Sequence, residues 1–331
     1  MHRRYTWALL GGVITTVALH IWTLLRFPAP FVDEVWQMSR AWSFLQSGKT
    51  FGMLDAGVPE QYPGYWTFLP WLGNVLQATA LRFSSTPSLL VLRALSLLFG
   101  GLLLLAIFII ARRLGGPLAA WISIALTAYS DPFWQSAHLA RYDIMVAAIG
   151  FSVIALYYIN QDWPRWWLRV LCGLMAGLAF ELHAFAAIFV VPIVALYLLR
   201  YRWRILHQRE VWQVFAGGLL GLIFYVTMHI LPYPQTFLAL NKLYFGPTHG
   251  PPLLSGSPRV MLGAFADTAR TLVTYAPLLL PLIIVMLIWM VRSATPSTRS
   301  WLAMTGALLL AFTLLLRNKF YYYHNLYQPS L

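Results

Sequence analysis

The chain has 331 residues, of which 60% are hydrophobic and only 10% are charged, whereas a soluble domain carries about 25% charged residues. This composition excludes an ordinary soluble protein and indicates an integral membrane protein. The formal net charge is +13, but the basic residues are scattered between apolar segments. We therefore expect no nucleic-acid partner; membrane lipids or an anionic lipid-linked substrate fit the charge better.

Apolar windows along the chain predict membrane-spanning helices, because roughly 20 residues cross the hydrocarbon core of a bilayer. The nine windows are residues 6–26, 89–111, 117–134, 143–160, 166–182, 184–200, 211–231, 271–291 and 300–316. The first follows a basic N-terminus, yet it is longer than a signal core and lacks a cleavage site, so we interpret it as an uncleaved span. We expect an all-α polytopic membrane protein that forms one transmembrane domain over residues 1–331.

Arginine clusters predict the orientation of these spans. The densest is RYRWRILHQR at residues 200–209, which the positive-inside rule places in the cytoplasm together with the N-terminus. Most carboxylates then fall at or near the outer face: Asp33, Glu34, Asp55, Glu60, Asp131, Asp143, Glu181 and Asp267. We therefore expect the chemistry to occur on the outer side of the cell's inner (plasma) membrane.

Two long segments are predicted on the outer face, residues 27–88 and 232–270. The first contains apolar residues at three- and four-residue steps, which predict an amphipathic surface helix ended by Gly48. These residues are Val35, Met38, Trp42 and Leu45. A second surface helix is expected around Trp71. Residues 232–270 are rich in Pro, Gly and Ser, which is typical of a flexible loop over a site.

Asp33 and Glu34 stand side by side where the first predicted span ends. One interpretation is a helix cap, since carboxylates in the first turn favour the helix dipole. The other is catalytic, because partial desolvation at the bilayer boundary makes a carboxylate a better base. The residues alone leave both interpretations open.

The order of several short motifs resembles that of the GT-C fold glycosyltransferases, and within them the protein O-mannosyltransferase and lipid A aminoarabinose transferase group. The motifs are DE at residues 33–34, EQYPGYW at 60–66, LRALSLLFG at 92–100, ARRLGG at 111–116 and ARYD at 140–143. The resemblance is close over residues 1–160. It implies transfer of a sugar, with inversion, from a polyprenyl-phosphate donor to a hydroxyl group of a lipid, glycan or protein on the outer (periplasmic) face.

The resemblance also implies roles for single residues. Asp33 matches the acidic residue that removes the acceptor proton, and Glu34 is expected to support it by hydrogen bonding. Arg141 and Asp143 match the Arg-x-Asp element, in which Arg141 positions the phosphate or the Asp33 loop. A plain salt bridge between Arg141 and Asp143 is the alternative. Tyr65, within EQYPGYW, is expected to bind substrate.

A divalent metal is a further possibility that the resemblance raises. Glu60 matches an acidic residue that the aminoarabinose transferases place before a Lys-Pro pair and use, with a histidine, to hold a metal. His249 and His324 are the possible histidine partners here. No lysine follows Glu60 in this chain, so we favour basic residues, Arg141 or Lys319, for neutralising the leaving phosphate. A solvated loop charge is the alternative interpretation of Glu60.

Two other classes of protein remain open at this point. A lipid or solute transporter or flippase would place charged or broken helices at mid-membrane depth, whereas here the polar residues crowd one face. A non-enzymatic scaffold is the third class. GT-C enzymes usually have more than nine spans, so the chain, which stops at Leu331, is expected to be either a short member or a truncated one.

Overall fold

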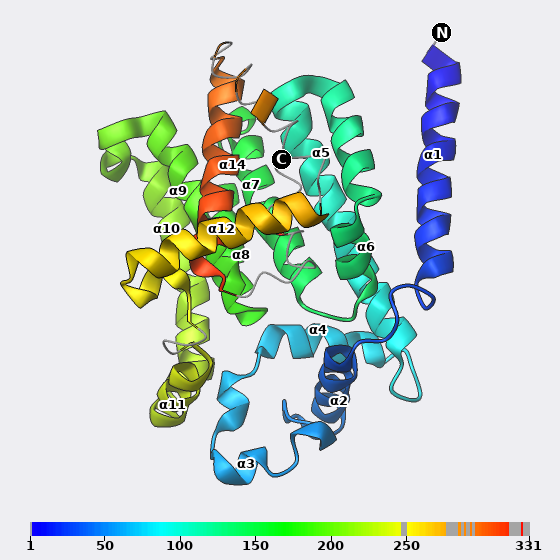
Figure 1. Ribbon diagram of the computed structural model, residues 1–331, viewed down its shortest axis with the longest axis vertical. Coiled ribbons are helices and arrows are strands. Elements are labelled where there is room, and N and C mark those ends of the chain that lie inside the picture. Colours follow the sequence, from blue (N-terminus) through cyan, green and yellow to red (C-terminus); the bar gives the residue numbers. More distant parts are fainter. Residues whose placement is uncertain are drawn as a thin grey trace.

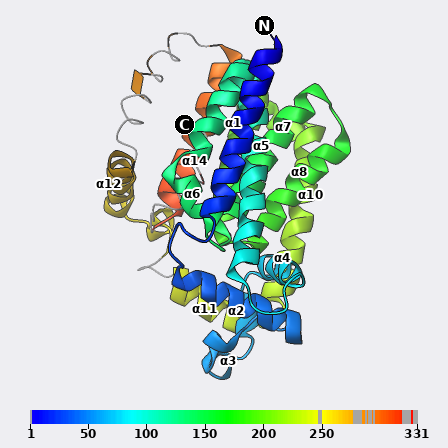
Figure 2. The same ribbon diagram turned by 90° about the vertical axis from the view of Figure 1, so that its right-hand side faces the viewer.

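The computed structural model describes residues 2–245, 250–275 and 295–317, together with residues 284, 285, 288, 292 and 326. Every regular element within these ranges is a helix (Figure 1), which confirms the predicted all-α class. The helices form a bundle with shorter helices gathered below one end of it (Figures 1 and 2).

Five helical segments of the described chain are long and apolar enough to cross a membrane. They are α5 (Leu89–Ala128), α7 (Asp143–Asp162), Ala184–His207 built on α9 (Ala187–Tyr201), Arg209–Ile230 built on α10 (Arg209–Tyr225), and α14 (Pro296–Leu315). Three other predicted spans differ from this set. α8 (Trp166–Leu178) has only 13 residues, α1 (His2–Thr23) is apolar over Gly11–Thr23, and the window 271–291 lies mostly outside the described residues.

α5 contains two of the predicted windows, because the chain doubles back within it. Gly116 has a φ of 83° and Pro117 follows it, which breaks the helical backbone. The rings of Phe108 and Trp121 lie 5.2 Å apart, although a straight helix rising about 1.5 Å per residue would separate them by about 20 Å. The two arms are visible in Figure 1. The predicted break between residues 111 and 117 is therefore real.

α7 is the central helix of the bundle, with 78% of its apolar window buried. It packs against α5, α8 and α9.

α8 and α10 lie backbone to backbone, because glycines face each other across their contact. A Cβ atom on Gly173 would lie 1.8 Å from the Val214 carbonyl oxygen, and one on Gly217 would lie 2.0 Å from that of Val170. Only glycine permits this approach.

Two groups of charged or surface elements lie at opposite ends of the bundle. At one end lie ion pairs among residues expected in the cytoplasm: Arg113 with Asp162 at 2.8 Å, and Arg169 with Glu210 at 3.0 Å. The opposite end carries the surface helices α2 (Val32–Ser47), α3 (Val58–Gln61), α4 (Trp71–Leu81) and α11 (Pro234–Phe245) (Figure 1). α6 (Asp131–His138) leads from α5 toward this end.

The two predicted outer segments have different outcomes. α2 is the expected amphipathic helix, and Gly48 ends it with a φ of 71° and an N–H donated to Phe44 O. Residues 232–270 contain α11 and α12 (Pro258–Tyr275) rather than the predicted flexible loop. Proline is well suited to the first position of a helix, because the N–H it lacks would have no helical partner there. Two prolines of this segment thus begin helices.

Candidate active site

Three of the predicted site residues, Asp33, Arg141 and Asp143, form one cluster at the N-terminal end of α2. Arg141 donates from Nε to Asp143 Oδ2 at 2.7 Å, and its Nη1 is paired with Asp33 Oδ2. The side chains of Arg141 and Asp143 are 8% and 5% exposed, whereas that of Asp33 is 35% exposed. One guanidinium therefore serves two carboxylates, and Asp33 is the one that solvent or a substrate can reach.

Glu34 faces the opposite way, into the protein, and is fully buried. Arg93 donates to both of its oxygens, from Nε at 2.8 Å and from Nη2 at 2.7 Å. The backbone N–H groups of Ala140 and Phe31 donate to the same carboxylate, at 2.7 and 2.9 Å. Glu34 thus forms a buried ion pair that joins α2 to α5, and its bond from Ala140 joins α2 to the α6–α7 loop.

Arg93 is a residue that the sequence analysis did not single out. Its remaining Nη1 donates to the carbonyls of Leu24 and Pro28, at 2.9 and 3.0 Å. An arginine in the first turns of an apolar helix is expensive unless it is paired. That rule could have identified Arg93 and directed the search to a buried carboxylate partner.

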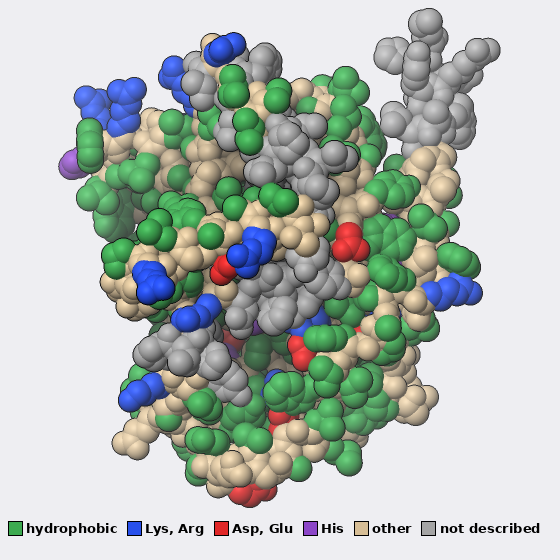
Figure 3. Space-filling model, viewed as in Figure 1, with side chains coloured by type: hydrophobic (Ala, Val, Ile, Leu, Met, Phe, Trp, Pro, Cys, Tyr) green, Lys and Arg blue, Asp and Glu red, His purple; other side chains and the backbone are tan. Residues whose placement is uncertain are grey.

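A cavity of about 240 Å³ has mixed walls, and we call it the polar cavity because Gln, Arg, His and Asn side chains line it beside apolar ones; none of the three cluster residues lines it. Gln37 and Arg40 line it from α2, and they share one helix face with Asp33 because they follow it by four and seven residues. Tyr142, which stands between Arg141 and Asp143, lines it from the other side. Acidic, basic and histidine side chains are visible together in a hollow of the surface below α12 (Figure 3).

Tyr65 lies in the wall of this cavity. It is 4% exposed, and Arg40 Nη2 donates to its hydroxyl oxygen at 3.1 Å. Arg40 also holds both oxygens of Asp55, at 3.1 and 2.9 Å. Burial would raise the pKa of Asp55, but the bonds and charge of Arg40 outweigh it and keep this pKa below its ordinary value. The Arg40–Asp55 pair, which the sequence analysis missed, thus fixes Tyr65.

A second pair missed by the sequence analysis borders the cavity. His229 lines it from a π-helical turn, Val226–Ile230, that follows α10. Its Nε2 lies 2.6 Å from Glu181 Oε2, and its Nδ1 is bonded to the Thr67 carbonyl. A carbonyl only accepts, so Nδ1 carries a hydrogen. The hydrogen bond between His229 Nε2 and Glu181 Oε2 needs one further proton, which lies between these two atoms. The bond to Thr67 joins the end of α10 to the first outer segment.

The remaining predicted residues are not in this cluster. Glu60 is exposed on the short helix α3. His249, His324 and Lys319 lie outside the described residues. In the described ranges, no group of three or more His, Cys, Asp or Glu side chains that could hold a metal ion is formed.

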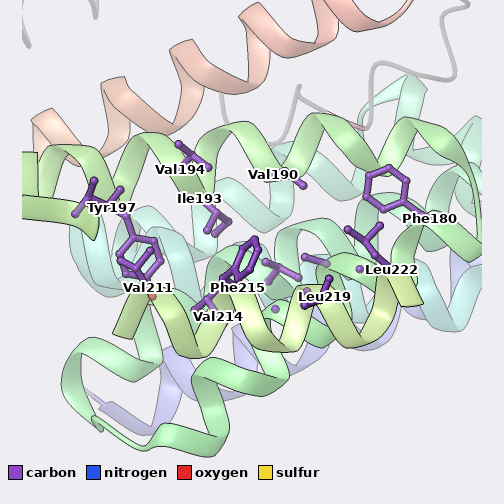
Figure 4. A pocket seen from close by; sticks show the side chains of 16 residues that line it. Phe180, Val190, Ile193, Val194, Tyr197, Val211, Val214, Phe215, Leu219 and Leu222 are labelled. Carbon is purple, nitrogen blue, oxygen red and sulfur yellow. The ribbon is translucent and has the colours of Figure 1, made fainter. Parts of the chain in front are cut away.

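An apolar pocket of about 310 Å³ lies between α8, α9 and α10. The labelled side chains run along these helices from Phe180 and Leu222 at one end to Tyr197 and Val211 at the other (Figure 4). Phe180 also lines the polar cavity. The apolar pocket and the polar cavity therefore have one wall residue in common.

Comparisons with known proteins find one family model and two solved structures. Residues 70–230 match the family model for dolichyl-phosphate-mannose-protein mannosyltransferases. The solved structure of ArnT from Cupriavidus metallidurans bound to undecaprenyl phosphate matches 97% of this chain, with a TM-score of 0.67 and 17% identity. Its apo structure matches 98%, with a TM-score of 0.61 and 17% identity. The chain spans 58% of the length of ArnT in both. No curated protein sequence gives a significant match.

The helix bundle with surface helices at one end is that of a polytopic integral membrane protein of the GT-C fold. The chain is similar to the dolichyl-phosphate-mannose-protein mannosyltransferases over residues 70–230, and to ArnT in fold over nearly its whole length. The resemblance predicted from the motifs is therefore confirmed.

Proposed function

We propose that the chain is a membrane glycosyltransferase that moves a sugar from a polyprenyl-phosphate donor to a hydroxyl acceptor on the outer face of the inner membrane. The observation that carries the proposal is the partly exposed carboxylate of Asp33, held by Arg141 and one turn of α2 away from Gln37, which lines the polar cavity. The similarity to a mannosyltransferase family and to ArnT, whose structure contains undecaprenyl phosphate, supports the same class.

In this proposal the donor lies across the two cavities. Its first isoprene units occupy the apolar pocket, and its sugar occupies the polar cavity beside Tyr65 and Tyr142. Apolar walls favour the hydrocarbon by burying it from water and lipid headgroups. A few polar groups fix the orientation of the sugar. The proposal puts the phosphate between the two cavities, near Phe180, which lines both.

Asp33 is the proposed general base. Its Oδ2 is held by Arg141, so its Oδ1 is the atom that takes the proton of the acceptor hydroxyl. The hydroxyl oxygen attacks the anomeric carbon as the bond to the phosphate oxygen breaks, and the bonding electrons leave with the phosphate. Attack opposite to the leaving group inverts the anomeric centre. The acceptor class, a lipid, glycan or protein, is set by what reaches Asp33 from the aqueous side.

Arg141 is better suited to positioning Asp33 than to binding the phosphate, because two carboxylates already occupy it. The leaving phosphate needs a positive group. Arg40 lines the cavity and uses Nε and Nη2 for Asp55 and Tyr65, which leaves Nη1 for the phosphate. Lys319 stays a second candidate for the same role.

The alternative class is a lipid or solute transporter or flippase. It would need charged groups at mid-membrane depth. The buried ion pairs of the described residues, such as Glu34 with Arg93 and Asp55 with Arg40, lie instead where the surface helices meet the bundle. Proteoliposomes decide between the classes: the glycosyltransferase consumes the lipid-linked sugar and releases polyprenyl phosphate, whereas a transporter only moves it between leaflets.

The orientation is tested by single cysteines in a Cys172→Ala background. We expect Met53→Cys and Leu254→Cys, at positions 90% and 75% exposed, to be labelled by an impermeant reagent from the outside. Trp203→Cys, at a position 94% exposed, should be protected. Labelling at 203 with protection at 53 would reverse the proposed orientation.

The donor pocket is tested by two adjacent leucines of α10. Leu219 lines the apolar pocket and is 46% exposed; Leu220 does not line it and is 56% exposed. Overpacking costs roughly 1–3 kcal/mol, so Leu219→Trp should lower kcat/KM for the lipid-linked donor by about tenfold. Leu220→Trp should leave it nearly unchanged. Equal effects of the two variants would place the isoprenoid elsewhere.

A further inference from the structure

A third cavity, of about 640 Å³, lies at the opposite end of the bundle from the candidate active site. Arginines from four segments line it: Arg113 at the turn of α5, Arg200 of α9, Arg202 at the start of the 3₁₀ helix Arg202–His207, and Arg299 of α14. Basic side chains gather at this end of the molecule in Figure 3. The proposed sugar transfer uses none of these residues.

The cavity has an excess of positive charge. Arg113 is paired with Asp162 at 2.8 Å. Arg200 is 3.6 Å from Glu210, which Arg169 holds more closely, at 3.0 Å. Neither Arg202 nor Arg299 has an ion pair with any residue in the described ranges, and no acidic residue lines the cavity. The site is therefore suited to an anion.

The shape of the backbone and the apolar part of the wall narrow the kind of anion. Arg202 has a φ of 51°, the only positive φ of a non-glycine residue in the described chain, a conformation that side chains rarely adopt. It carries the chain from α9 into the cavity wall. Leu198 and Leu199, which are 45% and 40% exposed, line the same cavity. A wall of leucines beside a rim of arginines suits a ligand that joins a phosphate to hydrocarbon.

We propose that this cavity binds the phosphate headgroup of an anionic phospholipid, in the membrane leaflet opposite to the candidate active site. Guanidinium groups form paired hydrogen bonds with phosphate oxygens. Basic pockets between helices are a common form of headgroup site. The lipid would join the α5 turn, α9 and α14, whose arginines come from distant parts of the sequence. The proposal goes beyond the proposed sugar transfer and does not depend on it.

The test uses the purified full chain in detergent, titrated with phosphatidylglycerol and, in separate arms, with phosphatidylcholine, inorganic phosphate and glycerol phosphate. We compare the parent chain with a variant carrying Arg202→Gln and Arg299→Gln. The control removes the same charge elsewhere, with Arg26→Gln and Arg270→Gln; Arg270 is 80% exposed on its side chain. At about 1 kcal/mol per arginine, the first pair should weaken phosphatidylglycerol binding by about 30-fold.

We expect the control variant to bind phosphatidylglycerol like the parent chain. Phosphatidylcholine should bind weakly to the parent chain, and its binding should not change when Arg202 and Arg299 are substituted. If the control variant weakens phosphatidylglycerol binding equally, the effect comes from net charge alone and the proposed site is wrong. Inorganic or glycerol phosphate that binds as tightly as the phospholipid would show that the ligand is a soluble anion and would overturn the lipid assignment.

Discussion

Asp33→Asn is expected to lower the turnover of sugar transfer by about 10²-fold or more, the usual scale for losing a general base. Asparagine keeps an oxygen that accepts from Arg141, and no helix cap is lost, because the N-cap of α2 is Phe31. The fold and the binding of the donor should therefore persist. Turnover is measured in reconstituted membranes, with donor binding and expression level determined alongside.

Glu60→Gln is the matched control for Asp33→Asn, because it also removes one carboxylate from the first outer segment, at an exposed position. It should leave turnover nearly unchanged. If Asp33→Asn retains near-normal turnover, Asp33 is only a helix-terminal charge and has no part in the reaction.

Glu34→Gln is expected to act on folding instead. The Glu34–Arg93 pair is fully buried, with both side chains at 0% exposure. Removing one partner of such a pair leaves the other charge uncompensated, which costs roughly 3–5 kcal/mol. We expect a large loss of thermal stability and of folded yield in detergent, while the folded fraction keeps most of its turnover.

The double variant Glu34→Gln with Arg93→Gln checks the origin of that loss. Because it leaves no unpaired buried charge, it should destabilise the chain by less than the sum of the two single variants. A Glu34→Gln protein of normal stability that has lost turnover would contradict this assignment and place Glu34 in the chemistry. On the expected results, Asp33 serves the reaction and Glu34 serves the fold.

The fold was largely predictable because a bilayer leaves few choices for the backbone. Long apolar windows must become helices. The break in α5 is indicated by three consecutive residues, Gly115, Gly116 and Pro117. Residues 232–270 were harder. Their prolines and glycines are typical of loops, and only the packing of residues such as Leu240, which is 1% exposed, shows that this stretch forms helices.

The candidate site was predictable only where a motif marks it. Asp33, Arg141 and Asp143 were found because they sit in recognisable short motifs, and the structure brings them together. Arg93 and Glu34 are 59 residues apart, and His229 and Glu181 are 48 apart. No local periodicity links residues at such separations. Their pairing follows from the helix packing, which a single sequence does not reveal.

The most direct test of the central claim is the mass of the lipid-linked sugars in membranes of cells that lack the protein. We predict that a polyprenyl phosphate carrying a sugar accumulates there, that the wild-type chain and Glu60→Gln both clear it, and that Asp33→Asn does not. Unchanged polyprenyl-linked sugars in the absence of the protein, or clearance by Asp33→Asn as complete as by the wild-type chain, would contradict the account.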